Sequence, residues 1–345
     1  MKVKNLINNE VVKMAVPVID VHTHMLSDGF LNVLKKHGGP MFTVKDVNTL
    51  KGVRPAIHRN GSMFMTIFDE MLNYDLRIAD MDKAKVDMSI ISLTCPNVYW
   101  GDAGVSVETA KMMNDSMAFH QSKHPDRFRF FCSLPWLYPD LAVQELKRAV
   151  NLGAVGVMVI ANVDEKHLTD PLFESIWKAI DDIALPVLIH PSLPPGSDSL
   201  KLDEFHLAAS NGFIIDTTLA ISRMIMNGFF DTFPNLKIIS CHGGGAIPYV
   251  IGRLDQVWAN VPAAREKISR PPSSYMPQIY ADSVLYRLNA LNLCMAEFGD
   301  DNVLFGSDYP HNIGDMAGCL SRVDALSAGA RDKVRSKNAL KLFNL

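Results

Sequence analysis

The stretch Val16-Pro17-Val18-Ile19-Asp20-Val21-His22-Thr23-His24 joins a short apolar, β-branched run to two histidines. The apolar run, residues 16–21, predicts a β-strand that is buried on both faces. Because side chains alternate along a strand, His22 and His24 at its end would point in the same direction. Two convergent imidazoles are poor core residues but a natural half of a metal site. The pair alone is weak evidence, because surface histidines with this spacing are common.

Seven further apolar runs of the same kind follow along the chain, and stretches with helical periodicity separate most of them. These runs are 88–93, 128–134, 154–160, 186–190, 237–241, 279–284 and 303–306. Eight buried strands that alternate with helices predict an α/β fold, specifically a TIM-type (β/α)8 barrel. A doubly wound open sheet is the rival interpretation, but no G-x-G-x-x-G follows the first strand.

Two stretches interrupt the alternation of strands and helices. Residues 27–69 follow the first strand, and residues 191–211 follow the fifth. Insertions after barrel strands lie at the C-terminal face, where active sites are built. We therefore expect 27–69 to form a small cap over a pocket. No linker divides the chain, so we expect residues 1–345 to form a single barrel domain.

The overall composition excludes several classes of protein. The 345 residues carry 34 Lys and Arg against 37 Asp and Glu, a net charge of −3, which argues against a nucleic-acid partner. Five widely spaced cysteines indicate neither a disulfide framework nor a zinc finger. No run is long enough to span a membrane, and Met1 to Ala15 lack the apolar core of a signal peptide. We expect a cytoplasmic protein that acts on a small molecule.

Further chemistry-bearing residues stand at the ends of other predicted strands. His190 ends the fifth strand, His242 follows the sixth, and Asp308 follows the eighth. In a barrel these strand ends surround one cavity, so together with His22 and His24 they predict a metal site.

Two neighbours of His242 have simpler interpretations. Because adjacent strand residues point to opposite faces, we expect Cys241 to pack outward into the core. Gly243-Gly244-Gly245 either permit a tight turn or let backbone N–H groups approach an anionic substrate.

Four motifs carry a resemblance to a known family. They are Asp20-Val21-His22-Thr23-His24, Ile189-His190-Pro191, Cys241-His242-Gly243-Gly244-Gly245-Ala246-Ile247-Pro248 and Gly306-Ser307-Asp308-Tyr309-Pro310. The sequence resembles the amidohydrolase superfamily, and within it the aminocarboxymuconate-semialdehyde decarboxylase-like branch that also contains hydroxybenzoate decarboxylases. This resemblance covers nearly the whole chain, from Val18 onward.

The resemblance implies that His22, His24, His190 and Asp308 bind one divalent metal ion, zinc or else manganese. His242 would be a catalytic residue outside this ligand set. Three imidazoles and a carboxylate are a donor set that suits such an ion. The fourth predicted strand carries no lysine that could bridge a second metal.

The activity implied by the resemblance is metal-dependent, nonoxidative decarboxylation of a hydroxybenzoate-type or muconate-semialdehyde-type acid. Loss of CO₂ leaves carbanion character, which a Lewis acid can stabilise. An acid must then supply a proton, and His242 and Asp308 are the candidates. The alternative is a hydrolase or hydratase of a lactone, amide or enol acid with the same metal ligands. A noncatalytic metal-binding barrel would not need a group such as His242.

Recognition of a substrate carboxylate calls for a cation. Met65 stands where the semialdehyde-decarboxylating relatives have an arginine, which argues against the aminocarboxymuconate semialdehyde itself as the substrate. By resemblance, Arg253 would reach the site of a neighbouring subunit, in a homodimer or a multiple of dimers. Arg54, His58 and Arg59 are weaker candidates for the missing contact.

Overall fold

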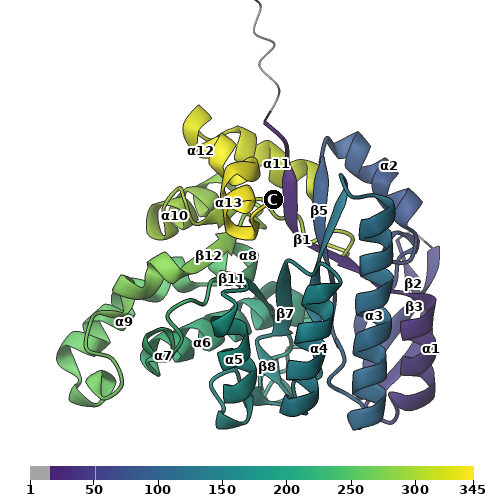
Figure 1. Ribbon diagram of the computed structural model, residues 1–345, viewed down its shortest axis with the longest axis horizontal. Coiled ribbons are helices and arrows are strands. Elements are labelled where there is room, and N and C mark those ends of the chain that lie inside the picture. The colour runs from purple at the N-terminus through teal and green to yellow at the C-terminus, as the bar shows by residue number, and fades with distance from the viewer. Residues whose placement is uncertain (1–15, 51) are drawn as a thin grey trace, which may run out of the picture.

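The computed structural model describes residues 16–50 and 52–345, and its centre is a ring of eight parallel strands (Figure 1). The ring is closed where Val21 N donates to Phe305 O at 2.9 Å and Thr23 bridges to Tyr309. The predicted (β/α)8 barrel is thereby confirmed. In ring order the strands are β1 (Ile19–Met25), β5 (Met88–Leu93), β6 (Phe128–Ser133), β7 (Gly156–Ile160), β10 (Val187–His190), β11 (Ile238–Ser240), β12 (Ile279–Asp282) and β13 (Val303–Leu304).

The first strand begins and ends later than the sequence predicted. β1 spans Ile19–Met25 rather than 16–21, so His22 and His24 lie within the strand and not beyond it. The reason is pairing on both edges: His24 is in register with Ser92 of β5, and its N–H donates to Tyr309 O at 2.8 Å. A break in register between Asp20 and Thr23 accompanies this extension.

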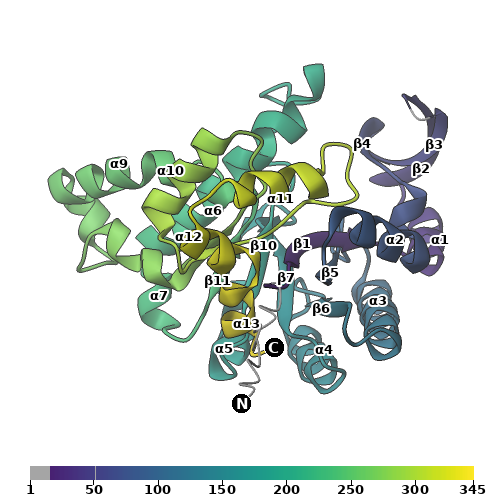
Figure 2. The same ribbon diagram turned by 90° about the horizontal axis from the view of Figure 1, so that it is seen from above.

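Helices surround the ring and connect its strands (Figures 1 and 2). The longer ones are α2 (Tyr74–Ala84), α3 (Ala103–Lys123), α4 (Pro139–Asn151), α5 (Glu174–Asp182), α6 (Phe213–Met226), α9 (Ile247–Asn260), α10 (Leu288–Phe298) and α11 (Met316–Asp324). The shorter ones include α7 (Phe229–Thr232), α8 (Cys241–Gly244), α12 (Ala328–Asp332) and α13 (Asn338–Phe343). In both views α9 extends away from the ring, which exposes most of its surface.

The segment after β1 has regular structure of its own. It contains α1 (Asp28–His37) and an antiparallel sheet of β2 (Phe42–Thr49), β3 (Gly52–Arg59) and β4 (Ser62–Thr66). The Ser27 hydroxyl accepts from Phe30 N at 3.1 Å and starts α1 as a helix N-cap. Figure 2 shows this small sheet beside α1 and α2, at one side of the ring.

The segment after β10 is less regular. It includes the short turns η3 (Glu204–His206) and η4 (Ala208–Gly212) and leads into α6. Its start is tied to that helix, because Asp216 Oδ2 accepts from Ser192 N at 2.9 Å. A two-stranded hairpin, β8 (Asn162–Val163) and β9 (Lys166–His167), follows β7.

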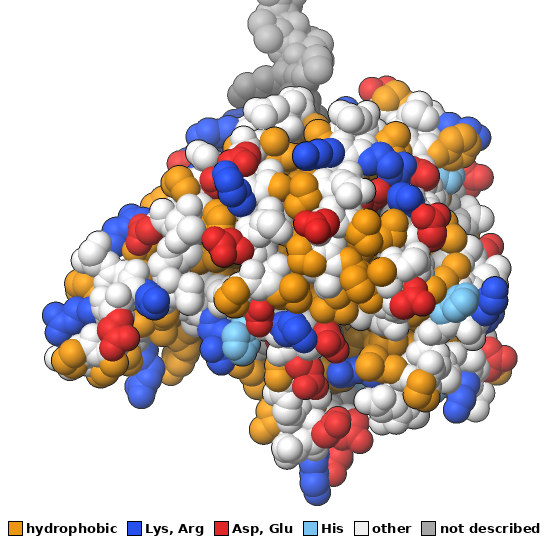
Figure 3. All heavy atoms as spheres, turned by 60° about the horizontal axis from the view of Figure 1, so that its bottom comes forward, with side chains coloured by type: hydrophobic (Ala, Val, Ile, Leu, Met, Phe, Trp, Pro, Cys, Tyr) orange, Lys and Arg blue, Asp and Glu red, His pale blue; other side chains and the backbone are white. Residues whose placement is uncertain are grey.

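Charged side chains of both signs are interspersed over the face seen in Figure 3, in keeping with the nearly balanced composition. Within residues 16–50 and 52–345, no helix combines the length and apolar character that crossing a bilayer requires. The expectation for Met1 to Ala15 lies outside the described residues.

Candidate metal centre

Four buried side chains from three strand ends converge inside the ring. The ligand atoms of His22, His24, His190 and Asp308 all lie within 4.8 Å of one another. Asp308 Oδ1 is 3.3 Å from Nε2 of His22 and 3.3 Å from Nε2 of His24. The His24 and His190 rings lie 4.7 Å apart between centroids and are nearly perpendicular. The structure therefore brings together the four residues that the sequence nominated as ligands.

The outer nitrogen of each imidazole is already engaged. His22 Nδ1 donates to Asp282 Oδ2 at 2.6 Å, and His190 Nδ1 donates to the carbonyl of the next residue at 2.9 Å. His24 Nδ1 hydrogen-bonds to Ser92 Oγ at 3.0 Å. A proton held on Nδ1 leaves the Nε2 lone pair free, and such outer partners also fix the orientation of a ligand ring.

The inner atoms of the same four residues have no such partners. Nε2 of His22, His24 and His190 and Oδ1 of Asp308 are buried without a hydrogen bond to any described residue. Leaving buried polar atoms unpaired costs about 1–3 kcal/mol each. A divalent cation would satisfy all four atoms at once, so this donor set fits a metal ion.

Burial opposes protonation of His22, but Cys241 and Asp282 raise the pKa of this imidazole well above its ordinary value, so a metal ion would displace a proton there. The protonation states of the other three residues favour metal binding directly. Burial lowers the pKa of His24 to about 3 and lowers that of His190 well below its ordinary value, so both rings are neutral. Burial opposes ionisation of Asp308, but His311 and the other neighbouring imidazoles lower the pKa of this carboxyl well below its ordinary value. Neutral imidazoles and an ionised carboxylate are the forms that bind metals.

Asp282 is a functional residue that the sequence reasoning missed. It ends β12, and its Oδ2 accepts from both His22 Nδ1 and His242 N, the latter at 3.0 Å. Its Oδ1 accepts from Gly243 N and Val284 N, both at 3.0 Å. Burial opposes its ionisation, but the contact with His22 lowers the pKa of Asp282. A carboxylate at the end of the seventh strand was the signal available in the sequence.

His242 lies beside the four-residue cluster in a tight turn. Its Nε2 is 3.5 Å from Asp308 Oδ2, and its ring centroid is 5.0 Å from that of His22. The backbone at His242 and at the next three glycines has positive φ, a conformation that glycine tolerates best. A Cβ on Gly244 would come within 2.5 Å of the Phe298 ring.

Two N–H groups of the glycine run bond within the protein. Gly243 N donates to Asp282, and Gly245 N donates to carbonyl oxygens of the same turn. Of the two interpretations of this run, the structure therefore supports the tight turn.

The predicted direction of Cys241 is wrong, although the residue is fully buried as expected. Its sulfur lies within 4.8 Å of a ring nitrogen of His22 and a carboxylate oxygen of Asp282. Strand alternation does not apply, because β11 ends at Ser240 and Cys241 begins the turn α8. Burial raises the pKa of Cys241 to about 12, so the group stays a thiol.

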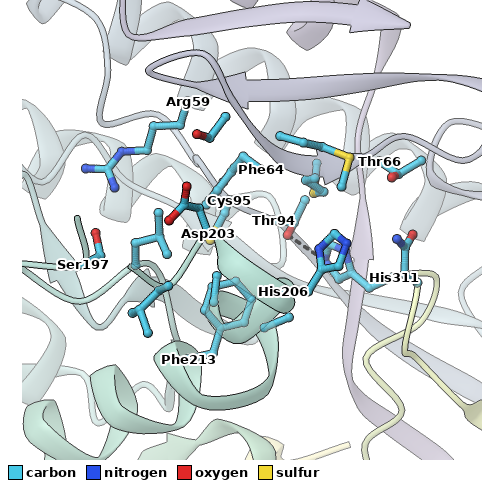
Figure 4. Close-up of a pocket in the computed structure, with 18 of the residues that line it drawn as sticks. Arg59, Phe64, Thr66, Thr94, Cys95, Ser197, Asp203, His206, Phe213 and His311 are labelled. Atoms are coloured by element: carbon cyan, nitrogen blue, oxygen red, sulfur yellow. Dashed lines mark hydrogen bonds between the residues drawn. The ribbon is translucent and has the colours of Figure 1, made fainter. Parts of the chain in front are cut away.

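A pocket of about 660 Å³ opens over the cluster, and both apolar and polar side chains line it (Figure 4). His190, His242 and Asp308 reach it from the ring. The small sheet and the segment after β10 supply much of the remaining wall, including Arg59, Phe64, Met65, Ser197, Leu202, Asp203 and His206. Thr94, Cys95 and His311 also line it and were not nominated from the sequence.

The proposed carboxylate-binding cations lie in different places. Arg253 is exposed on α9 and does not line the pocket of its own chain. Arg54 and the buried His58 do not line it either, whereas the half-buried Arg59 does. Met65 is buried in β4 and presents an apolar side chain to the pocket.

A buried arginine supports the ligand-bearing strand from behind. Arg77 of α2 is completely buried and donates hydrogen bonds to Thr23 Oγ1 and His24 O. Its guanidinium also lies 4.8 Å from the centroid of the Tyr309 ring, whose hydroxyl donates to Asp80 at 2.6 Å. These contacts join β1 to the residue after Asp308 and so help to fix two of the ligand positions.

Comparison with known proteins gives concordant matches along most of the chain. The amidohydrolase family model matches residues 19–345. A 2-amino-3-carboxymuconate-6-semialdehyde decarboxylase of Dictyostelium discoideum is 29% identical over 333 residues, 95% of this chain and 91% of the relative. A gamma-resorcylate decarboxylase of a Rhizobium species is 31% identical over 285 residues, 79% of this chain and 87% of the relative.

Solved structures share the fold. A 5-carboxyvanillate decarboxylase from Sphingomonas paucimobilis superposes with a TM-score of 0.84 at 24% identity, over 96% of this chain and 100% of the other. A dihydroxybenzoic acid decarboxylase from Polaromonas, solved with manganese and 2-nitroresorcinol, gives a TM-score of 0.77 at 25% identity, over 95% of this chain and 97% of the other.

One sequence relative has a different activity. A 2-keto-4-carboxy-3-hexenedioate hydratase of Sphingobium is 27% identical over 69% of this chain and 67% of its own length.

Proposed function

The chain belongs to the amidohydrolase family, and we propose that it is a metal-dependent, nonoxidative decarboxylase of an unsaturated or aromatic carboxylic acid. The observation that carries the proposal is the convergence of four unpaired, buried ligand atoms at the bottom of the pocket. The decarboxylases among its relatives support the same reaction.

The reaction breaks the bond between the substrate carbon and its carboxylate, releases CO₂, and places a proton on that carbon. A divalent ion held by His22, His24, His190 and Asp308 would supply Lewis-acid stabilisation of the electron pair left behind. We assign the proton to His242, which lines the pocket next to this cluster. The two carboxylate oxygens of Asp308 face different groups. Oδ1 faces the proposed metal ligands, and Oδ2 faces Nε2 of His242, the proposed proton donor.

We propose one metal ion per chain, zinc or manganese. Three imidazole nitrogens and one carboxylate oxygen suit both ions. Among the described residues, β7 offers apolar side chains and no lysine beside the cluster, which favours a single ion. The manganese in the Polaromonas decarboxylase makes that ion the first to test.

The pocket walls favour a flat, apolar acid. Phe64, Phe213 and Ile313 bring aromatic and aliphatic surface to the pocket, as expected for a site that binds a ring. With Met65 in place of the arginine found in semialdehyde-decarboxylating relatives, we favour a hydroxybenzoate-type acid over the aminocarboxymuconate semialdehyde.

We propose a homodimer, or a multiple of dimers, built on α6 and α9. Tyr249 is 83% exposed on α9, and Ile215 and Leu219 are exposed on the neighbouring α6. Exposed apolar side chains on adjacent helices favour an interface. Arg253 lies on the same helix as Tyr249, so an interface there would carry it toward a partner's pocket.

We place the protein in the cytoplasm. All five cysteines are free thiols and buried, which suits a reducing compartment.

The test is to load the protein with manganese or zinc and supply aromatic and enol acids, 2,6-dihydroxybenzoate first. We expect CO₂ release and, in D₂O, one deuterium on the product carbon that carried the carboxylate. Addition of water with no CO₂ would instead support the hydratase alternative, which the Sphingobium relative favours. Metal bound with no reaction of either kind would contradict both enzymes.

A further inference from the structure

We propose that His311, held in place by Thr94, contacts the substrate and selects acids with an oxygen substituent next to the carboxyl-bearing carbon. This inference rests on the proposed function, because it assigns a role within the same pocket. It adds a specificity-determining residue beyond the ligands and His242.

The chain returns to the site immediately after Asp308. His311 N donates to Asp308 O at 3.1 Å, and this turn brings the imidazole back over the ligand cluster. The His311 ring centroid lies 4.9 Å from that of His24 and 6.4 Å from that of His190. His242 lies instead beside His22, at 5.0 Å. Two imidazoles outside the proposed ligand set therefore flank it, each beside a different ligand.

The orientation of His311 is fixed by one of its two nitrogens. Its Nε2 lies 2.9 Å from the hydroxyl of Thr94, the residue that follows β5 (Figure 4). Among the described residues, Nδ1 of His311 has no hydrogen-bond partner, and this half-buried side chain lines the pocket. One nitrogen thus anchors the ring, and the other is free for a ligand.

The surroundings of His311 make this free nitrogen selective. Polar side chains such as Arg59 and Asp203 line this pocket together with apolar ones such as Met65. In Figure 4 Arg59 and Asp203 lie away from His311, so they do not compete with Nδ1 for an oxygen that reaches this imidazole. An acid whose carboxyl group occupies the ligand cluster carries its neighbouring substituents toward the flanking imidazoles. An oxygen there can hydrogen-bond to Nδ1, whereas a C–H group cannot. Sites built around such a bond discriminate against the analogue that lacks the oxygen.

The experiment compares two unreactive probes, 2-nitrophenol and 3-nitrophenol, on the manganese-loaded protein. They carry the same groups, but only 2-nitrophenol has its hydroxyl next to the carbon that bears the nitro group. Affinity is measured by calorimetry for the wild type, His311→Phe and Thr94→Val, and metal content is measured for each. His167→Phe, an exposed histidine on β9, is the matched control.

We expect His311→Phe to keep its metal and to weaken 2-nitrophenol binding about fivefold to tenfold, as loss of one hydrogen bond does. Binding of 3-nitrophenol should change less, Thr94→Val should follow the same trend, and Thr94→Ser should restore affinity. Equal weakening of both probes, no change in either, or loss of metal would overturn the proposal. Because probe binding needs no turnover, the affinities of the two probes can still be compared if the decarboxylation assay fails.

Discussion

The floor and the roof of the pocket are built on different principles. On the floor, the ligand-bearing side chains lie on the strands or within four residues of their ends and are buried. Most of their outward-facing atoms are paired, as between His22 and Asp282. The roof comes from the β2–β4 sheet and residues 191–211, where Arg59 is half-buried and Asp203 is exposed. Neither of these two forms an ion pair with a described residue within 4.0 Å.

We infer from this difference that the floor carries out the reaction and the roof selects the substrate. A floor that is buried and held by hydrogen bonds keeps the ligand atoms in one arrangement, which metal binding and proton transfer require. A roof of loops and a small sheet can change its side chains at little cost to the fold. Changes to the floor should therefore affect metal and turnover, and changes to the roof should affect only which acid binds.

The largest effects should come from two histidines of the floor. His24→Ala should lose both metal and activity, because it removes a ligand. His242→Ala should keep one metal per chain and lose about 10²–10⁴-fold in turnover, the usual contribution of a general acid. Elemental analysis and CO₂ release measure the two properties separately, and circular dichroism should find both variants folded. Loss of metal from His242→Ala would mean that His242 is a ligand.

The next effect concerns the support behind the ligands. Asp282→Asn should weaken metal binding by about 10- to 100-fold, because the carboxylate that orients His22 becomes a neutral amide. Competition with a chelator measures this affinity. Asp181→Asn is the matched control: it changes a buried carboxylate on α5 that bonds Asn235 and touches no ligand. Equal loss in the two variants would mean that general destabilisation, rather than orientation of His22, is responsible.

The residues of the floor were largely predictable from the sequence, whereas for the roof only its position after the first and fifth strands was. His190, His242 and Asp308 could be nominated because barrel topology brings strand ends together wherever the chain runs between them. Asp282 was missed because its role depends on a contact across 260 residues, His22 Nδ1 to Asp282 Oδ2.

The elements within the roof were not predicted, for a different physical reason. Residues 27–69 were expected to form a cap, but no helix or strand was named in them, and they form α1 and three paired strands. These strands show no strict alternation of buried and exposed residues, so no period of two marks them in the sequence. The same limit affected Cys241, where a turn with positive φ replaced the expected alternation of a strand.

A smaller effect is expected at the proposed subunit boundary. Arg253→Ala should raise KM or lower turnover about tenfold, equivalent to about 1.4 kcal/mol, if it bonds a carboxylate in the partner's pocket. Mixing Arg253→Ala with His242→Ala chains should restore activity, because a mixed dimer contains one complete site. Activity equal to the sum of the two parents, with subunit exchange verified, would assign Arg253 to its own chain or to the surface.

The smallest effect should come from the charge on the roof. Arg59 lines the pocket without an acidic partner among the described residues, so a second carboxylate on a substrate would find its guanidinium available. Because this side chain is half-exposed, water screens the attraction, and Arg59→Gln should raise KM by about fivefold at most. The increase in KM should appear with a benzene dicarboxylate and be absent with the matching monocarboxylate, and metal content and kcat should stay unchanged.

Arg54→Gln, on the same strand but outside the pocket lining, is the control and should leave KM for both substrates unchanged. A fall in kcat or in metal content for Arg59→Gln would break the separation of floor from roof, because a residue of the small sheet would then be acting on the reaction itself.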